Sequence, residues 1–256
     1  MIIDCFIFFN ELKMLKFRLE ELYEHVDYFV IVESSKTFTN KPKPLFFHEN
    51  RILFEKYLNK IIYHVIDFPV NFLDNEWERE FYQRDSIIFG LDKVPNIKND
   101  DLVIISDVDE IPDITSIKKT NINDLMFGCH LVQDFYYYNL NLCKNRKWNW
   151  SVILPFSKVK NIKISEVRKS HPNMSGINPG GWHFSYFGDT KNIINKINSF
   201  SHQEYNNDYY KDEERILKCI SNGLDIFERE VSEDEKLIFK DFINNDYLPK
   251  NYNMLL

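Results

Sequence analysis

The first hundred residues alternate between short apolar runs and amphipathic segments. Residues 2–9 form an apolar run, and apolar positions recur at helical spacing across residues 11–26. A second apolar run, residues 28–32, ends at Glu33. A strand, a helix and a strand within about 35 residues have the length of a βαβ unit, in which the two strands run parallel.

The same alternation continues along the chain. The pattern predicts a short helix over residues 50–57 and a strand over residues 60–66. A helix over residues 76–89 is expected to stop at Gly90, because glycine suits the left-handed position after a helix. The apolar run 102–105 predicts a fourth strand. We therefore expect the first half to be an alternating α/β sheet.

The pattern changes after about residue 120. Residues 127–142 and 148–159 are rich in aromatic and β-branched residues around the polar turn 144–147, which predicts a hairpin or mixed strands. Helical patterns that would cover the sheet or a cleft follow at residues 190–199, 208–222 and 232–243. Because no internal repeat or low-complexity linker interrupts the chain, we predict one domain over residues 1–256.

Composition excludes several classes of protein. With 44% hydrophobic and 28% charged residues the chain is globular, and it holds 22 Phe, 14 Tyr and 4 Trp but only 7 Gly. Rossmann dehydrogenases and P-loop NTPases need closely spaced glycines around phosphate, and no window supplies either pattern. The net charge of −7 argues against nucleic acid as a partner, because phosphate-backbone binding demands a broad basic surface.

Cysteine spacing and hydropathy indicate in which cellular compartment the protein is expected. Cys5, Cys129, Cys143 and Cys219 show neither C-x-x-C nor zinc-like spacing, which indicates reduced thiols, although a Cys129–Cys143 bridge stays open. No apolar stretch reaches 18 residues and no signal peptide pattern begins the chain. We therefore expect a cytoplasmic protein without a transmembrane segment.

An acidic motif, Asp107-Val108-Asp109, follows the fourth apolar run. In open α/β sheets ligands bind at the carboxyl ends of strands, and side chains two residues apart on an extended backbone point the same way. Together the two carboxylates suit a hard cation such as Mn²⁺ or Mg²⁺, which could bridge a nucleotide diphosphate. The alternative is an acidic turn in which Glu110 and Asp113 are merely solvated.

Glycine is concentrated in one place. Four of the seven glycines lie between Gly176 and Gly188, around Gly181-Trp182-His183, which predicts a loop where backbone freedom or close approach is needed. His183 is therefore a candidate third metal ligand, and Trp182 is a candidate flat face for an acceptor sugar. A satisfied structural histidine is the alternative for His183.

Six segments of the chain resemble glycosyltransferase family 17, inverting enzymes best known for the β-1,4-mannosyl-glycoprotein N-acetylglucosaminyltransferases that add a bisecting GlcNAc. D-x-D-E-I-P together with G-W-H-x-S is much more specific than D-x-D alone. The segments span almost the whole chain: residues 8–11, 32–34, 42–46, 101–112, 181–185 and 248–252.

The resemblance implies a GT-A fold, an α/β fold with a Rossmann-like mixed sheet flanked by helices. It also implies a UDP-sugar donor, expected to be UDP-GlcNAc, a glycan or glycoconjugate acceptor, and Mn²⁺ or Mg²⁺ held by the D-x-D. Residues 1–120 would then bind nucleotide sugar and metal, and residues 121–256 the acceptor. The animal enzymes carry a membrane anchor and stem before this domain, whereas this sequence starts at the first strand, so Golgi residence and a glycoprotein acceptor stay open.

Donor-binding candidates lie at the ends of the predicted strands and on one helix. Asn10, Glu11 and Glu33 are placed to hydrogen-bond uracil or ribose, with strand-end capping as the alternative. On the helix before the D-x-D strand, Arg84 and its neighbour Asp85 would lie near the donor, since a guanidinium suits phosphate oxygens. A surface ion pair of Arg84 with Glu80 is the competing interpretation.

The reaction itself needs a metal ligand and a base. Asp109 is the first choice for direct metal coordination, and Asp107 contacts the metal through water or binds the ribose. Inversion requires a carboxylate that takes the acceptor proton, for which Glu110 and Glu204 are the first candidates and Asp189 is a third. Trp148 and Trp150 are further aromatic residues that could stack on an acceptor sugar.

Two other functions compete with glycosyl transfer. A D-x-D after an apolar strand also begins haloacid-dehalogenase-type phosphatases, in which the first aspartate is the nucleophile. Those enzymes place the motif on an early strand and follow it with a small residue and threonine, whereas Glu110 follows here. The third possibility is a carbohydrate-binding protein that lacks turnover.

Overall fold

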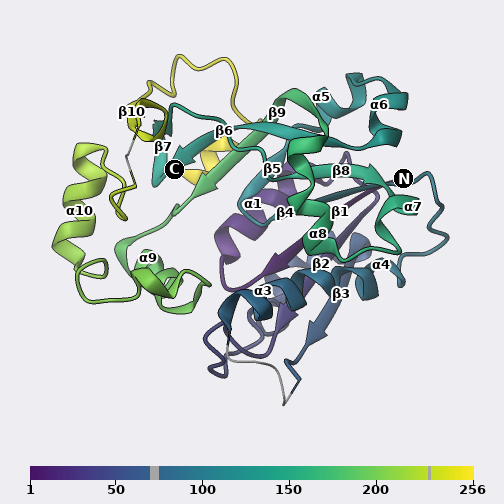
Figure 1. The fold of residues 1–256 in the computed structure, drawn as a ribbon, viewed down its shortest axis with the longest axis horizontal. Coiled ribbons are helices and arrows are strands. Elements are labelled where there is room, and N and C mark those ends of the chain that lie inside the picture. The colour runs from purple at the N-terminus through teal and green to yellow at the C-terminus, as the bar shows by residue number, and fades with distance from the viewer. Residues whose placement is uncertain (70–74, 230–231) are drawn as a thin grey trace.

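One mixed sheet runs through the protein. The computed structural model describes residues 1–69, 75–229 and 232–256. Eight of its ten strands lie in the order β10-β7-β6-β8-β4-β1-β2-β3, and β9 pairs with both β6 and β5 (Figure 1). The strands are β1 (Ile2–Phe8), β2 (Tyr28–Ser34), β3 (Ile61–Ile66), β4 (Leu102–Asp107), β5 (Glu110–Pro112), β6 (Cys129–Tyr137), β7 (Asn139–Lys144), β8 (Val152–Pro155), β9 (Ser175–Ser185) and β10 (Leu237–Phe239).

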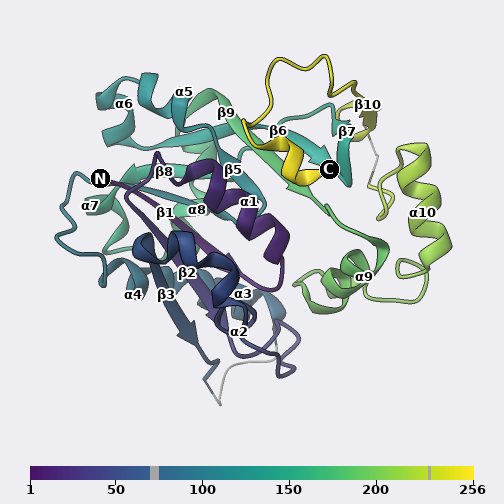
Figure 2. The same cartoon turned by 180° about the vertical axis from the view of Figure 1, so that it is seen from behind.

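The helices cover both faces of this sheet. Figure 2 shows α1 beside the C-terminal segment on one face, and Figure 1 shows α4, α7 and α8 on the other. The helices are α1 (Leu12–Leu22), α2 (Phe46–Glu49), α3 (Glu76–Asp85), α4 (Ile87–Leu91), α5 (Ile114–Lys119), α6 (Ile122–Phe127), α7 (Phe156–Val159), α8 (Ile164–Lys169), α9 (Thr190–Ser199) and α10 (Glu213–Asn222). The predicted α/β fold, a mixed sheet flanked by helices, is confirmed.

The parallel half of the sheet forms as its periodicity predicts. β4, β1, β2 and β3 lie side by side in this order and run parallel, and each is a mostly apolar run of six or seven residues. Leu15, Leu19 and Leu22 of α1 are buried against one face, whereas Ile87 and Leu91 of α4 are buried against the other. This half therefore has an apolar core on both sides of its strands.

The second half departs from the predicted elements. The glycine-rich segment 175–185 is not a loop but β9, which runs parallel to β6 and antiparallel to β5. Close approach is indeed required there, because a Cβ on Gly181 would lie 2.1 Å from the carbonyl oxygen of Ile111, and Gly181 has φ +125°. Glycine thus lets β9 lie close beside β5 where the two strands pair.

Other element boundaries also differ. The helix predicted over residues 76–89 breaks at Ser86, and Gly90 lies inside α4 rather than after a helix. Gly90 instead allows α4 to approach β2, since a Cβ there would lie 2.3 Å from Val30 Cγ1. The predicted helix 232–243 is wrong, because it holds a short 3₁₀ turn and β10, whose edge pairing with β7 overrides the local pattern.

The four cysteines are buried, and Cys129 and Cys143 are not joined, so the bridge between them does not form. Within residues 1–69, 75–229 and 232–256, no helix combines the length and apolar character needed to span a membrane.

Candidate active site

A cleft of about 580 Å³ opens where β1 and β4 end. Its lining comes from both halves of the sequence: the loops after β1 and β2, helix α3, the loop after β4, the segment after β7, β9 and helix α9. This is the position at which open α/β sheets bind ligands. A volume of this size is sufficient for a nucleotide-sized ligand.

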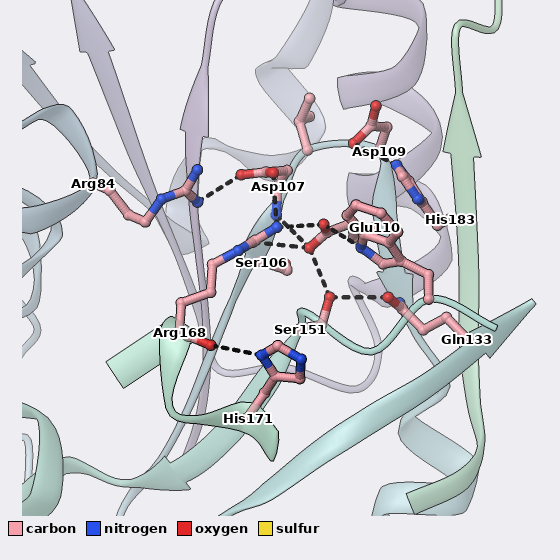
Figure 3. Close-up of polar contacts among 12 residues, drawn as sticks. Arg84, Ser106, Asp107, Asp109, Glu110, Gln133, Ser151, Arg168, His171 and His183 are labelled. Atoms are coloured by element: carbon pink, nitrogen blue, oxygen red, sulfur yellow. Dashed lines mark hydrogen bonds and ion pairs between the residues drawn. The ribbon is translucent and has the colours of Figure 1, made fainter. Parts of the chain in front are cut away.

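Two arginines hold Asp107 at one wall of the cleft. Arg84 Nη1 donates to Asp107 Oδ1 at 2.6 Å, and Arg168 Nη2 donates to Asp107 Oδ2 at 2.8 Å (Figure 3). Burial alone would raise the pKa of Asp107, but the charges of Arg168 and Arg84 hold that pKa well below its ordinary value. Arg84 also binds Glu80 at 2.7 Å, so the ion pair weighed as an alternative exists alongside the contact with Asp107.

Glu110 lies behind this wall and is fully buried. Its carboxylate accepts hydrogen bonds from the Asp107 amide, Trp148 Nε1, Ser151 Oγ and both terminal nitrogens of Arg168 (Figure 3). A general base needs an oxygen that faces the acceptor, and Glu110 does not line the cleft. The prediction of Glu110 as the base is therefore corrected: the residue positions Arg168 and the motif loop.

Asp109 faces the centre of the cleft from the other side of the motif. Lys196 Nζ donates to its Oδ2 at 3.0 Å, and His183 Nε2 lies 3.7 Å from its Oδ1. Burial would raise the pKa of Asp109, but Lys196 and His183 lower it. Burial lowers the pKa of His183 more than the nearby carboxylates raise it, so the imidazole is neutral at pH 7 and can act as an electron-pair donor.

The possible metal ligands of the cleft fit a cation that arrives with a diphosphate. They do not form a site in which protein side chains alone enclose the cation. Among the residues that the structure describes, no group of three or more His, Cys, Asp or Glu side chains is arranged to hold a metal ion. Asp109 and His183 supply two donors, and His183 Nδ1 is buried without a hydrogen-bond partner. Mg²⁺ is commonly held by one or two carboxylates plus substrate phosphates, and two protein donors meet that requirement.

Arg18 supports the motif from beneath and was missed by the sequence analysis. Its side chain is fully buried in α1 and binds both oxygens of Asp4, also fully buried, at 2.8 and 2.6 Å. The same guanidinium donates to the carbonyl oxygens of three residues of the motif loop: Asp107, Val108 and Glu110. Its spacing of three residues from Leu15 and four from Leu22 places it at the apolar side of α1, and this signal in the sequence could have identified it.

The predicted donor-binding residues separate into two groups. Glu11 lines the cleft at the end of β1, and Arg84 lines it from α3. Asn10 does not line it, and Asp85 accepts a hydrogen bond from the Ser165 amide, so Asp85 joins α3 to α8. For Asn10 and Asp85 the expected contact with the nucleotide sugar is not supported by their positions.

Glu33 is a structural residue. It is fully buried, and its carboxylate accepts hydrogen bonds from Lys43 Nζ, the amides of Phe46 and Phe47, and Tyr63 Oη. The two amides belong to the first turn of α2. Both oxygens are therefore engaged, and the prediction that Glu33 binds uracil or ribose is corrected.

Substituting Glu33→Gln is expected to lower stability without changing donor binding. The amide retains the side-chain size but loses the charge that Lys43 and the α2 amides bind, which costs about 1–3 kcal/mol of unfolding free energy. Urea denaturation would measure the loss, and the Kd of UDP should stay within about twofold of wild type. A large rise in that Kd with unchanged stability would restore the donor-binding role.

Trp182 points away from the cleft. It is buried against Tyr247 with ring centroids 4.8 Å apart, and its Nε1 donates to the Tyr247 carbonyl at 3.2 Å. Alternate residues of a strand face opposite sides, so β9 can present only one of Trp182 and His183 to the cleft. It presents His183, and the prediction of Trp182 as an acceptor platform is corrected.

Other aromatic rings line the cleft in place of Trp182. Trp148 and Trp150 line the cleft from the segment after β7, and Trp77 and Phe81 line it from α3. The Trp148 ring lies 4.4 Å from the His183 ring, next to Asp109. Aromatic faces on two walls of a cleft suit the apolar face of a pyranose.

Glu204 does not meet the requirement for a base. Its side chain is 56% exposed, it pairs with His202 at 2.7 Å in a 3₁₀ turn, and it does not line the cleft. Four carboxylates in the described part of the chain do line it: Glu11, Glu80, Asp107 and Asp109.

The fold and this cleft place the chain among α/β proteins that bind a ligand at the carboxyl ends of sheet strands. It belongs to glycosyltransferase family 17, whose model matches residues 1–254. The resemblance found in the sequence is thereby confirmed.

Individual relatives are more distant. The human β-1,4-mannosyl-glycoprotein 4-β-N-acetylglucosaminyltransferase is 36% identical over 107 residues, which are 40% of this chain and 20% of that protein. The chain thus matches about a fifth of the length of its curated relatives. A proposed nucleotide-diphospho-sugar transferase from Desulfovibrio desulfuricans has a TM-score of 0.35 at 10% identity and covers 86% of this chain and 94% of its own. The Streptococcus pneumoniae glycosyltransferase GlyE has a TM-score of 0.33 at 11% identity, and the match covers 99% of this chain and 58% of its own.

Family membership also bears on the alternative functions. In a haloacid-dehalogenase-type phosphatase the first aspartate of the motif must be a free nucleophile. Here both oxygens of Asp107 are bound by arginines, and the family is one of glycosyltransferases. The phosphatase interpretation is therefore wrong.

Proposed function

We propose that this protein is a metal-dependent inverting glycosyltransferase that moves GlcNAc from UDP-GlcNAc to a glycan acceptor. The observation that carries the proposal is the convergence of Asp109 and His183 with Arg84, Arg168 and Lys196 in one cleft at the end of β4. Two metal-ligating side chains beside three cations suit a diphosphate and its counter-ion. The membership of family 17 supports the sugar-transfer chemistry.

The donor would occupy the side of the cleft formed by the parallel strands. The nucleoside would lie at the loops after β1 and β2, where Phe9, Glu11, Lys36 and Phe38 line the cleft. The diphosphate would then reach the acidic motif. Of the three residues predicted to bind uracil or ribose, Glu11 lines this part of the cleft. Arg84 lines the cleft as well.

Asp109, with His183 beside it, would hold Mn²⁺ or Mg²⁺, and the ion would supply Lewis-acid stabilisation of the departing diphosphate. Arg84 and Lys196 line the same space and bring fixed positive charge to the leaving group. Asp107 binds both Arg84 and Arg168, so it orients the two guanidiniums that surround the leaving group. These cations are pre-arranged, so little reorganisation is needed as negative charge develops on UDP.

Inversion requires a carboxylate that receives the proton of the attacking hydroxyl. Asp107 binds the two arginines and Asp109 would bind the metal, which leaves Glu11 and Glu80 among the described carboxylates of the cleft, although Glu80 also pairs with Arg84 at 2.7 Å. Glu80 stands on α3 between Trp77 and Phe81, on the aromatic wall where an acceptor would bind. We therefore propose Glu80 as the first residue to test for the base, with Glu11 as its comparison.

A panel of nucleotide sugars tests the proposal. We expect UDP-GlcNAc to bind and to release UDP with Mn²⁺, and both binding and release to fall in EDTA. Coupled detection of free UDP and calorimetric UDP titration measure the two effects. Binding of glycans without binding or turnover of any UDP-sugar would instead identify a carbohydrate-binding protein, and the transferase proposal would fail.

A further inference from the structure

Three cations occupy an end of the cleft that the donor does not need. We name Lys144, Arg146 and Arg229 the basic end. Lys144 ends β7, which lies beyond β6 and β8 from the nucleoside side of the sheet. The side chains of Arg146 and Arg229 are 35% and 38% exposed, so both guanidinium groups reach the solvent of the cleft.

The counter-ions of the basic end stand behind it. Asp225 is fully buried and binds Lys144 Nζ at 2.8 Å and Arg229 Nε at 3.1 Å. Glu235 lies 2.6 Å from Arg146 Nε and 3.5 Å from Lys144 Nζ. Neither carboxylate lines the cleft. In the described part of the chain, therefore, two carboxylates hold three cations: Lys144 is buried, and the part-exposed side chains of Arg146 and Arg229 are the ones that can meet a ligand.

Arg146 is also fixed in orientation. Its guanidinium carbon lies 5.2 Å from the centre of the Phe135 ring and 5.6 Å from that of Trp148. Stacking of this kind holds the planar guanidinium and directs its N–H groups, which match the geometry of carboxylate and phosphate oxygens. Trp148 in turn contacts His183 beside the reacting centre. The Trp148 ring thus contacts both Arg146 of the basic end and His183 beside the proposed site of transfer.

We propose that the basic end binds an anionic group, a carboxylate or a phosphate, carried by the acceptor glycan. The inference rests on the proposed function, which assigns the diphosphate to Arg84 and Lys196 and leaves this region to the acceptor. An acceptor ring stacked beside Trp148 would place a charged substituent against Arg146 and Arg229. The acceptor class is therefore acidic sugars or phosphorylated glycans rather than neutral ones.

Matched probes test this without knowledge of the natural acceptor. With the donor site saturated by UDP and Mn²⁺, methyl glucuronide is compared with methyl glucoside, and GlcNAc 6-phosphate with GlcNAc, by ligand-observed NMR titration. We expect at least one acidic probe to bind about tenfold more tightly than its neutral partner. The pair that shows the preference distinguishes carboxylate from phosphate, and the preference should shrink with added salt.

Two variants locate the binding. Arg146→Gln and Arg229→Gln should each remove most of the preference for the acidic probe, while the affinity for UDP and for the neutral probe stays within about twofold of wild type. The matched control is Arg51→Gln, which removes an exposed guanidinium outside the cleft and should change nothing. Unchanged UDP affinity also shows that the variants fold.

The outcomes separate the two proposals. If the protein binds UDP but treats acidic and neutral probes alike, or if the acidic preference survives in both variants, the basic end is not an acceptor site. If UDP does not bind in the presence of Mn²⁺, the proposed function fails, and the inference that rests on it fails too.

Discussion

Asp109→Asn is expected to reduce sugar transfer at least about 100-fold, because it removes the charge that we propose to hold the metal ion while keeping the side-chain size. Asp109 is the only one of the two motif aspartates without an arginine clamp among the described residues, and it faces His183 across 3.7 Å. The variant should also lose the Mn²⁺-dependent part of UDP affinity, which calorimetry with and without EDTA measures.

Asp100→Asn provides the control, since Asp100 is exposed in the loop before β4 and should leave both quantities unchanged. Thermal unfolding of Asp109→Asn checks that the fold persists, because Lys196 loses its partner in this variant. A protein with normal stability and the same UDP affinity in Mn²⁺ as wild type would show that Asp109 has no metal-binding role.

The parallel half of the fold could be predicted because its information is local. Each strand from β1 to β4 is a mostly apolar run, and α1 carries its apolar residues at helical spacing, so the local pattern alone identifies them. The second half could not be predicted in the same way. β10 and β9 are defined by their partners β7, β6 and β5, and their sequences lack a strand period that stands out locally.

The candidate site shows the same contrast between residues that the local sequence identifies and residues that only the fold brings together. Asp107, Asp109 and His183 could be found because an acidic pair after a buried strand and a histidine among glycines are visible in the sequence. Arg168 and Lys196 could not, because each is one basic residue on an amphipathic helix that looks like any solvated face. The error over Trp182 followed from treating segment 175–185 as a loop: once it is a strand, its neighbour His183 alone faces the cleft.

The burial of Arg18 leads to the largest expected effect on stability. Arg18→Met should lower the unfolding free energy by about 3–5 kcal/mol, because it leaves the Asp4 carboxylate buried without its partner and removes the donor to the motif carbonyls. Urea denaturation measures the loss. Arg51→Met, at an exposed arginine, is the matched control and should change stability by less than about 0.5 kcal/mol.

A double variant separates the ion pair from the support of the motif. Asp4→Leu combined with Arg18→Met removes both buried charges, so part of the lost stability should return. Transfer activity should not return, because the carbonyls of Asp107, Val108 and Glu110 still lack the guanidinium that fixes the loop. If the double variant regained wild-type activity along with its stability, Arg18 would serve the core alone. Activity that stays low in a stable protein would show that Arg18 of α1 holds the loop of the acidic motif in the position that transfer requires.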